Sequence, residues 1–322
     1  MRIIKLSEDF TPRHEGLLYG IDVESEQPRD VTIEVVDMAS SEVVATQRLR
    51  EITTAEVNIA HYIEPITDYT PSHAAHTTFK EAPSRCTMIR SGEELSAPII
   101  TSVNRCHISR PSCVCAMPNR RTISYGEVDE VLILAAERDT LTANIVADTG
   151  ESLSLDYGTA TGAAILSIST KDFGKKFRTL DVELLCNGES LGHLHYTAVP
   201  AHKGSLRLAW VSGAGSIERY TFPVVVKSQL STVKESIDTS EGRRVVSAVS
   251  KSILSLKSRY EAAATIEALA EIISSPRVWI EGASGCAEVE VESLSVDKNL
   301  FNEPDIVAIN ILEWRKEEPM VW

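Results

Sequence analysis

Hydrophobic and polar residues alternate in short runs along most of the chain, and Gly, Pro, Asn and Asp residues separate the runs. This period-two pattern is typical of β-strands joined by turns. In the run 30–36, Val31, Ile33 and Val35 share one face of a predicted strand. The pattern therefore predicts a mainly β fold. Further strands are predicted at 42–46, 55–63, 128–136, 140–148, 162–170, 178–186, 278–281, 287–294 and 305–312.

A β-hairpin is predicted from 205 to 226. Its two strands, 205–211 and 219–226, flank the loop Ser-Gly-Ala-Gly-Ser, which is rich in residues that accept positive φ angles. Each strand has one apolar face, and the two faces together are expected to bury an aromatic core. The residues of these faces are Leu206, Leu208, Trp210, Tyr220, Phe222, Val224 and Val226.

One segment has a clear helical pattern. Ser258 and Glu261 have the spacing of a capping box, and apolar residues then recur at helical spacing until Pro276. These apolar residues are Ala262, Ile266, Leu269 and Ile273. A less regular helical pattern over 246–256 contains several serines, which favour turns and caps over helix interiors.

The alternation fails from Glu64 to Arg121, a segment with six prolines, three histidines and four of the six cysteines. Irregular segments of this length are usually functional loops, linkers or arms, and we expect this one to become ordered only against a partner. The pattern changes predict multi-domain β-sandwich and β-barrel modules. These are a 1–120 N-terminal β module with the Pro/Cys/His-rich loop, a 121–227 central β-sandwich, and a 228–322 C-terminal β-barrel with at least one helix.

The composition narrows the classes of function. The formal net charge is −14 at pH 7, and no run of Lys or Arg exceeds two residues, which disfavours binding to nucleic acid and to anionic membranes. The longest apolar run, 131–136, is too short for a membrane helix, and residues 1–10 lack the apolar region of a secretory signal. We therefore expect synthesis in the cytoplasm, with reduced cysteines.

A zinc site is not expected, although the middle segment has thiol and imidazole groups. Cys113 and Cys115 are separated by one residue, whereas paired zinc ligands usually have two to four residues between them. The groups considered are His73, His76, Cys86, Cys106, His107, Cys113 and Cys115. His193 and His195 share one face of a probable strand, with His202 nearby, and are interpreted as a polar, solvent-facing stripe.

No motif nominates catalytic or cofactor-binding residues. The chain has no Gly-x-Ser-x-Gly sequence, and the glycines of the 213–215 loop open no helix that could bind phosphate. We therefore expect a protein that is not an enzyme. Five aromatic residues in or beside predicted strands are expected to be core or interface anchors. They are Trp210, Tyr220, Phe222, Trp279 and Trp314.

Three segments resemble structural proteins of tailed phages and prophages. The run from Gly204 to Phe222, a strand ending in Arg-x-x-Trp followed by a glycine turn and an aromatic-x-Phe strand, is similar to a pattern in their virion proteins. The helix of 259–275 and the strands that follow it look like the barrel-plus-helix units of tail tubes, distal tail proteins and baseplate components. The early strands at 31–36 and 57–62 have a sequence pattern similar to that of these proteins. The resemblance therefore covers roughly 1–63 and 200–322.

The resemblance implies a virion structural subunit of a phage tail, baseplate or neck. Such a subunit would be made in the host cytoplasm, form a homo-oligomeric ring through its strand edges, and contact other virion proteins. Two alternatives remain open. A carbohydrate-binding or adhesin-like β-sandwich would expose aromatic residues on a sheet face, and a hydrolase would hold two close carboxylates with separated pKa values.

Overall fold

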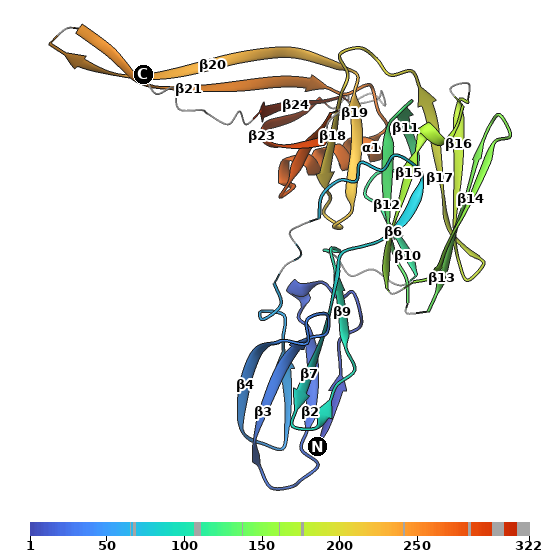
Figure 1. Ribbon diagram of the computed structural model, residues 1–322, viewed down its shortest axis with the longest axis vertical. Helices are drawn as coiled ribbons and strands as arrows, with labels where there is room; N and C mark the ends of the chain where they lie inside the picture. Colours follow the sequence, from blue (N-terminus) through green and yellow to red (C-terminus); the bar gives the residue numbers. More distant parts are fainter. Residues whose placement is uncertain are drawn as a thin grey trace.

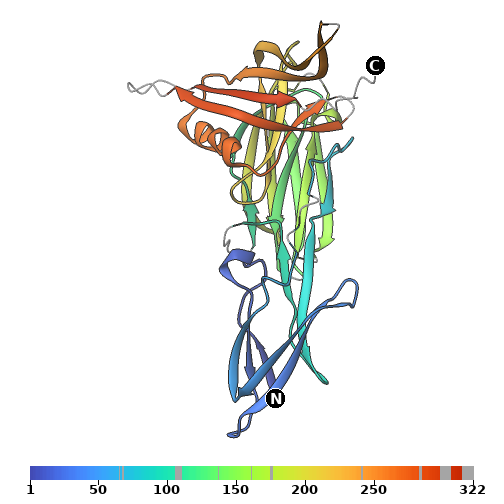
Figure 2. The same ribbon diagram turned by 90° about the vertical axis from the view of Figure 1, so that its left-hand side faces the viewer.

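The computed structural model describes residues 1–64, 66, 69–105, 111–136, 138–160, 162–174, 177–240, 242–282, 285–297 and 306–313. The fold is mainly β, as the alternation predicts. The molecule is elongated, with an N-terminal module at one end, two further β modules side by side at the other, and a long hairpin that projects from them (Figures 1 and 2).

The N-terminal module consists of two sheets that enclose one core. One sheet contains, in spatial order, β1 (Arg2–Lys5), β2 (Leu18–Asp22) and β5 (Thr54–Asn58). The other contains β4 (Val43–Ile52), β3 (Arg29–Asp37), β7 (Ser84–Ser91) and β8 (Glu94–Leu95), with β9 (Ile99–Ser102) also paired to β7. A short 3-10 helix, η1 (Arg13–Glu15), precedes β2. Because alternate strand residues point inward, Tyr19, Ile33 and Ile89 meet in the core.

The central module is a β-sandwich. Its first sheet has the order β10 (Ser112–Val114), β12 (Val128–Leu134), β15 (Ala163–Ser169) and β6 (Thr78–Glu81). The second has the order β11 (Arg120–Ser124), β17 (Glu189–Val199), β16 (Thr179–Cys186), β13 (Thr140–Ala147) and β14 (Ser152–Thr159). A 3-10 helix, η2 (Thr170–Asp172), follows β15. Val131, Leu166 and Ile145 lie in the core between the sheets.

The C-terminal module is built on one seven-stranded antiparallel sheet. Its order is β19 (Ile217–Phe222), β18 (Leu206–Val211), β22 (Val278–Gly282), β23 (Gly285–Asp297), β24 (Ile306–Glu313), β21 (Gly242–Lys257) and β20 (Val224–Thr239). The helix α1 (Ala263–Ala270) and the 3-10 helix η3 (Glu271–Ser274) cover one face of this sheet. Ile266, Leu269 and Ile272 pack there against Trp210 and Phe222.

The predicted hairpin is confirmed as β18 and β19, with Leu206 opposite Phe222 and Val211 opposite Ile217. The sequence pattern shows one apolar face, but both faces are buried because the hairpin lies between α1 and the central module. Val226 differs from the prediction. It belongs to β20, beyond the hairpin, and its residue surface is 61% exposed.

The predicted helix is confirmed, but its predicted cap is wrong. Ala262 is the N-terminal capping residue and makes no side-chain cap. The Ser258 hydroxyl instead accepts a hydrogen bond from the backbone N–H of Val307, so it ties the start of the helical segment to β24. The helical pattern over 246–256 is also a wrong prediction, because these residues form part of β21, where cross-strand pairing with β20 overrides the helical spacing.

The segment from 64 to 121 differs from the expected irregular loop. It contains β6 to β10, which pair with strands of two modules: β7 with β3, and β6 and β10 with β15 and β12. Pairing with these distant strands orders the segment. The pattern of hydrophobic residues within the segment does not reveal such pairing. β6 and β10 therefore join the central sandwich, although they precede residue 120, and β18 and β19 join the C-terminal sheet, although they precede residue 227.

The strands β20 and β21 form one long hairpin, called the arm below. The strand β24 pairs with β21 only from Ser252 to Lys257. Beyond that point, residues 231–251 pair only with each other among the strands that the structure describes. The arm consequently extends away from the rest of the molecule (Figure 1).

Candidate functional site

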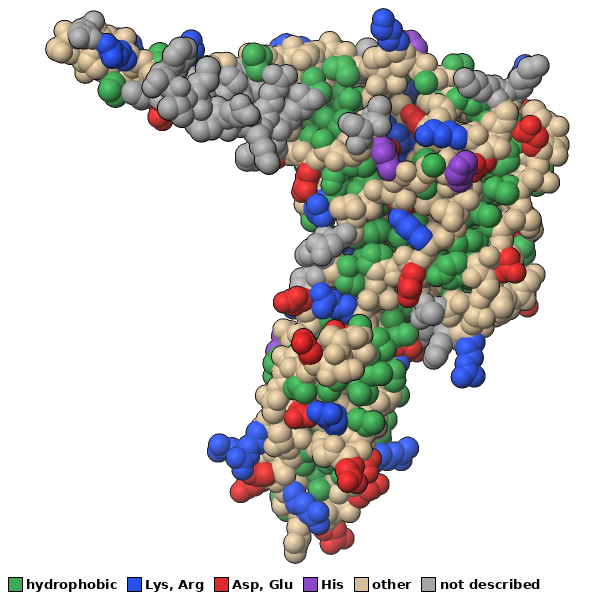
Figure 3. Space-filling model, in the orientation of Figure 1, with side chains coloured by type: hydrophobic (Ala, Val, Ile, Leu, Met, Phe, Trp, Pro, Cys, Tyr) green, Lys and Arg blue, Asp and Glu red, His purple; other side chains and the backbone are tan. Residues whose placement is uncertain are grey.

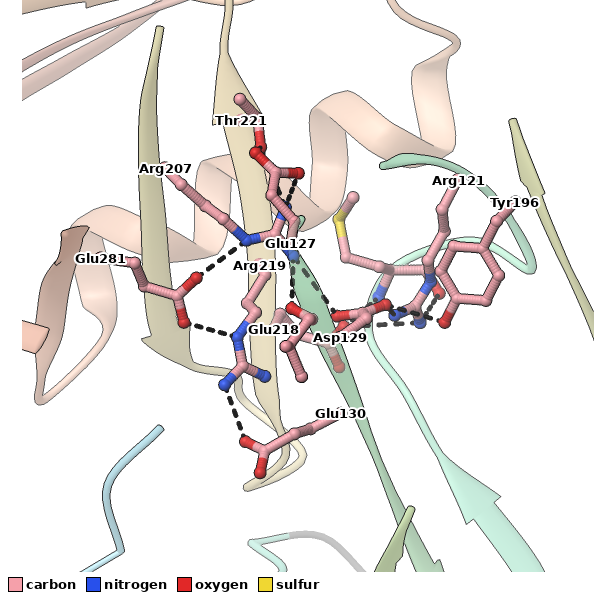
Figure 4. A network of polar contacts seen from close by, with 12 residues as sticks. Arg121, Glu127, Asp129, Glu130, Tyr196, Arg207, Glu218, Arg219, Thr221 and Glu281 are labelled. Carbon is pink, nitrogen blue, oxygen red and sulfur yellow. Dashed lines mark hydrogen bonds and ion pairs between the residues drawn. The ribbon is translucent and has the colours of Figure 1, made fainter. Parts of the chain in front are cut away.

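A buried network of charged side chains joins the central sandwich to the C-terminal sheet (Figure 4). Its arginines lie on β11, β18 and β19, and its carboxylates lie on or beside β12, β19 and β22. The network residues are Arg121, Glu127, Asp129, Glu130, Tyr196, Arg207, Glu218, Arg219, Thr221 and Glu281.

Arg219 bridges the two modules directly. Its Nη2 atom lies 2.9 Å from a carboxylate oxygen of Glu130 on β12, and its Nε atom lies 2.6 Å from Glu281 on β22. The Arg219 side chain is fully buried. Lys80 of β6 adds a second ion pair to Glu130, at 2.8 Å. A buried carboxylate of one module is thus neutralised by a cation of the other.

Arg207 makes a second bridge. Its guanidinium donates to Glu281 of its own module at 2.8 Å and to Glu127, just before β12, at 2.6 Å. It also donates to the carbonyl oxygen of Val128 at 2.8 Å. The remaining Glu127 oxygen accepts from the Thr221 hydroxyl at 2.8 Å. These contacts fix the edge of the central sheet against the hairpin β18–β19.

Arg121 completes the network from the central side. It forms an ion pair of 2.8 Å with Asp129, and a longer contact of 3.6 Å with Glu218 on β19. The Tyr196 hydroxyl donates to Asp129 at 2.8 Å. Glu218 is fully buried and accepts from the backbone N–H of Ala116 at 2.7 Å. The segment before β11 is thereby held against β19.

The charges in this network are mutually stabilising. Burial raises the pKa of Asp129, but the guanidinium of Arg121 and the other network arginines outweigh it, so the pKa lies below its usual value. Burial likewise raises the pKa of Glu130, and Arg219 outweighs that effect. Burial lowers the pKa of Arg219, but Glu130 and Glu281 raise it above its usual value. All these groups are therefore charged at neutral pH.

An apolar contact surrounds the charged network. Ala209 and Trp279 on the C-terminal sheet pack in one cluster with Leu132 and Ile165 of the central sheet. Trp279 is 2% exposed, and the guanidinium of Arg277 lies over its ring at 4.9 Å from the centroid. Because strand residues alternate between faces, the C-terminal sheet binds α1 on one side and the central sandwich on the other.

The predicted aromatic anchors occupy two parts of this arrangement. Trp210, Tyr220 and Phe222 are buried in the cluster that contains α1. Trp279 is buried at the junction with the central module. Trp314 lies outside the described residues.

The glycine loop of the hairpin contacts the chain that leaves the N-terminal module. The backbone N–H of Arg105 donates to the carbonyl oxygen of Ala214 at 2.9 Å. Gly215 has a φ of +96°, and a Cβ atom there would lie 2.1 Å from the carbonyl oxygen of Val103. This loop therefore needs glycine for a close backbone contact between modules.

The histidine candidates do not converge on one site. His76 contacts Asp172 at 2.7 Å and His195 contacts Asp181 at 2.6 Å, in separate exposed pairs. The carboxylate partner of His195, on the neighbouring strand, was not evident from the sequence. Within the described part of the chain, no three His, Cys, Asp or Glu side chains are grouped to hold a metal ion.

Cys113 and Cys115 do come together. A hydrogen bond between their thiols lowers the pKa of Cys113 and raises that of Cys115, and burial raises both. The Cys115 sulfur also lies beside the guanidinium of Arg121. Cys106 and His107 lie outside the described residues.

Comparisons with known proteins find similar chains among solved structures. No family model and no curated protein matches the chain. The chain is similar to a chain in the virion of a native gene transfer agent particle, with 13% identity, a TM-score of 0.24, and coverage of 34% of this chain and 91% of that one. It is also similar to a chain in the tail of an empty gene transfer agent particle with C6 symmetry, with 14% identity and the same TM-score and coverages. Both likenesses are confined to about one third of this chain.

The charged network was missed by sequence reasoning, although one signal was present. Arg207, Arg219 and Glu281 lie in predicted strands whose other residues are mostly apolar, and Glu130 directly precedes the most apolar run of the chain. Charged residues at such positions indicate buried ion pairs. Their partners lie 62 to 89 residues away along the chain, so the pairing itself had no local signature.

Proposed function

We propose that the protein is a structural subunit of a virion tail, baseplate or neck, without catalytic activity, in which copies assemble into a ring and contact other virion proteins. The arm is the observation that carries this proposal. The charge of the arm and the junction between the modules also support it. They explain how the subunit would recognise its neighbour and transmit force. The proposed location is the virion, after synthesis in the host cytoplasm.

Among the described strands, the outer part of the arm has unpaired edges, and it exposes apolar side chains. Beyond the contact with β24, neither of its strands pairs with a third strand among those described. Free strand edges are templates for pairing with another chain. The arm also exposes large apolar residues. These are Val226 (61%), Leu230 (62%), Ile237 (52%) and Val245 (52%).

The arm differs in charge from the rest of the chain. Residues 224–257 contain six of the 32 Lys and Arg residues but only three of the 46 Asp and Glu residues. The remainder of the chain is therefore strongly acidic. Basic side chains are visible near the free end of the arm (Figure 3). A basic arm and an acidic body attract each other between copies, which favours a second copy of this chain as the partner.

The junction between the modules suits a mechanical role. Buried ion pairs and apolar contacts hold the central and C-terminal modules in one orientation, so a force on the arm reaches the body. Asp129 and Glu130 are buried acidic residues of this region, and both have lowered pKa values. A general acid needs a raised pKa, so these residues fit ion pairing better than hydrolysis.

The adhesin alternative has less support. A glycan platform would present tyrosine, tryptophan or phenylalanine side chains on an open sheet face. Among the described residues, Tyr260 is the one such side chain with high exposure, at 72%, and it lies beside α1 rather than on a sheet.

Removal of the outer arm tests the proposal. Leu230 and Ser252 are cross-strand partners, so residues 231–251 can be replaced by Asn-Gly, a two-residue turn that keeps the register. Purified wild-type chain is expected to form oligomers of discrete stoichiometry in sedimentation velocity and rings in negative-stain images. The shortened chain is expected to stay folded and monomeric.

Two results would contradict the proposal. One is a wild-type chain that remains monomeric at all concentrations, even with the products of neighbouring genes. The other is a shortened chain that assembles as the wild type does. A circular dichroism spectrum of the shortened chain, compared with the wild type, controls for folding.

A further inference from the structure

We infer that the arm of one copy binds in a groove between η3 and β23 of a second copy. This inference rests on the proposed function, because it names the surface that receives the arm. The groove has a volume of about 580 Å³. It is lined by Ile272, Ile273, Ser275, Pro276, Val278, Glu288, Val289, Glu290 and Val291.

The groove has an unpaired strand edge along one wall. β22 pairs with β23 only up to Val289, opposite Val278. From Glu290 onward, β23 pairs with β24 on its other side, and no described strand lies against its first side. The backbone groups of β23 on that side are available to an incoming strand.

The side chains of the groove combine apolar and acidic groups. Ile273 is 50% exposed although it is a large apolar residue. Glu288 and Glu290 are both exposed at the rim, and Glu288 forms an ion pair with Arg277 at 2.9 Å. No ion pair or hydrogen bond of the Glu290 side chain is found among the described residues. Val278 and Val289 pack with Ile272 on the side of the sheet that η3 covers, so Glu288 and Glu290 point to the opposite side. A strand that adds to this edge should therefore be apolar on the η3 side and basic on the other side.

One face of the arm is basic and also carries exposed apolar side chains. Leu230 and Lys234 are four residues apart on β20, so they share a face with Ser236. Arg243 belongs to the same face, because its Nε atom donates to the hydroxyl of Ser236 at 2.6 Å. Val245 is opposite Ser236 and lies on the same face.

This arm face is exposed because the core beneath it ends. Leu254 and Leu256 occupy the same face of the hairpin near its base and are buried against the C-terminal core. Further out, Leu230 and Val245 have no such cover and are more than half exposed. Asp238 is opposite Arg243, and with Lys234 the face still has an excess of positive charge. It therefore complements the acidic side of the β23 edge. Ile237 lies on the opposite face of β20 and is 52% exposed, so it complements the apolar side.

The arm of the same copy already belongs to its own sheet, where β21 is paired to β24. The partner of the arm is consequently a second copy of this chain, and β20 adds to the free edge of β23 in that copy. Lys234 would face Glu290, and Ile237, on the opposite face of β20, would meet the apolar wall near Ile273.

Charge reversal at these two exposed positions tests the pairing. Lys234→Glu places an acidic arm against an acidic groove, and Glu290→Lys places a basic arm against a basic groove. Each variant alone is expected to weaken self-association about tenfold, because like charges meet in every contact. The double variant Lys234→Glu/Glu290→Lys is expected to recover association to within about threefold of the wild type.

Mixing the two single variants gives the sharpest result. The acidic arm of the first fits the basic groove of the second, and the wild-type arm of the second fits the wild-type groove of the first. The mixture is therefore expected to associate more tightly than either variant alone. Sedimentation velocity of equimolar mixtures measures this, with Glu26→Lys, an exposed acidic position in the N-terminal module, as the matched control.

The outcomes separate this inference from the proposed function. If the outer arm is needed for assembly but neither the mixture nor the double variant recovers association, the groove is not the receiving surface and the proposed function stands. If the shortened arm leaves assembly unchanged, the proposed function itself fails. Recovery in the mixture, with Glu26→Lys behaving as the wild type, supports contact between the arm and the groove of different copies.

Discussion

The junction between the modules and the arm use similar residues in opposite ways. At the junction, Arg219 is fully buried and its charge is matched by two carboxylates of the same chain. On the arm, Lys234 and Leu230 are exposed, and no ion pair or hydrogen bond of the Lys234 side chain is found among the described residues. The first region is complete within one copy, whereas under the proposed function the second is completed by a second copy.

This difference indicates that the junction contributes to the stability of one copy, whereas the proposed contribution of the arm is to association between copies. Buried ion pairs cost desolvation energy that is recovered only when the geometry is good, so they fix one orientation of two modules. Exposed apolar and basic side chains cost little in the free subunit, and they gain energy when another copy covers them. Substitutions at the junction should therefore change the stability of the chain, and substitutions on the arm should change its association.

The largest effect is expected from Arg219→Met. The change keeps the apolar part of the side chain but leaves Glu130 and Glu281 buried with less compensating charge. Loss of one partner from a buried ion pair typically costs about 3–5 kcal/mol. Urea unfolding should show this loss, and limited proteolysis should cleave the connection at 200–205 faster.

A matched control is Arg48→Met, which removes an exposed ion pair with Asp30 in the N-terminal module. It is expected to leave the unfolding midpoint unchanged within experimental error, because solvent screens exposed pairs. An equal, small effect of both substitutions would mean that the buried network does not hold the modules together.

Acid pH is expected to have a smaller, graded effect on the same network. The pKa values of Asp129 and Glu130 are lower in the folded chain than in the unfolded chain. At acid pH the folded state therefore binds fewer protons, so the free energy of unfolding should be constant above about pH 5 and fall as the pH decreases further. The midpoint of urea unfolding, measured from pH 7 to pH 3, tests this.

Tyr196→Phe sharpens the acid experiment. The substitution removes the hydrogen bond that the Tyr196 hydroxyl donates to Asp129 at 2.8 Å. The pKa of Asp129 should then lie closer to its unfolded value, and the loss of stability below pH 5 should become shallower. The chain with the shortened arm should keep the wild-type pH dependence. A steeper slope in Tyr196→Phe would contradict the assigned role of Asp129.

The sequence predicted the strands of the junction better than their partners, and it did not predict the arm. Alternation located β12, β18 and β19 because each has residues on a buried face, and Ile266 and Leu269 located α1 through helical spacing. The arm was missed over 246–256, since spacing alone cannot distinguish a serine-rich strand from a helix. The bridge from Arg219 to Glu130 was missed because contacts between distant strands are fixed by tertiary packing rather than by local pattern.

The smallest effect on stability is expected from Leu230→Ala on the arm. Leu230 is 62% exposed, so its truncation should change the free energy of unfolding by no more than about 0.5 kcal/mol. The same truncation at Leu256, which lies at the base of the same hairpin and is 1% exposed, should cost about 2–5 kcal/mol. For association the order should reverse, with Leu230→Ala weakening it about tenfold. Chemical unfolding of the monomer and sedimentation velocity measure the two quantities separately. If Leu230→Ala lowers stability as much as Leu256→Ala does, the arm is packed within its own copy, and the contrast between the two regions is lost.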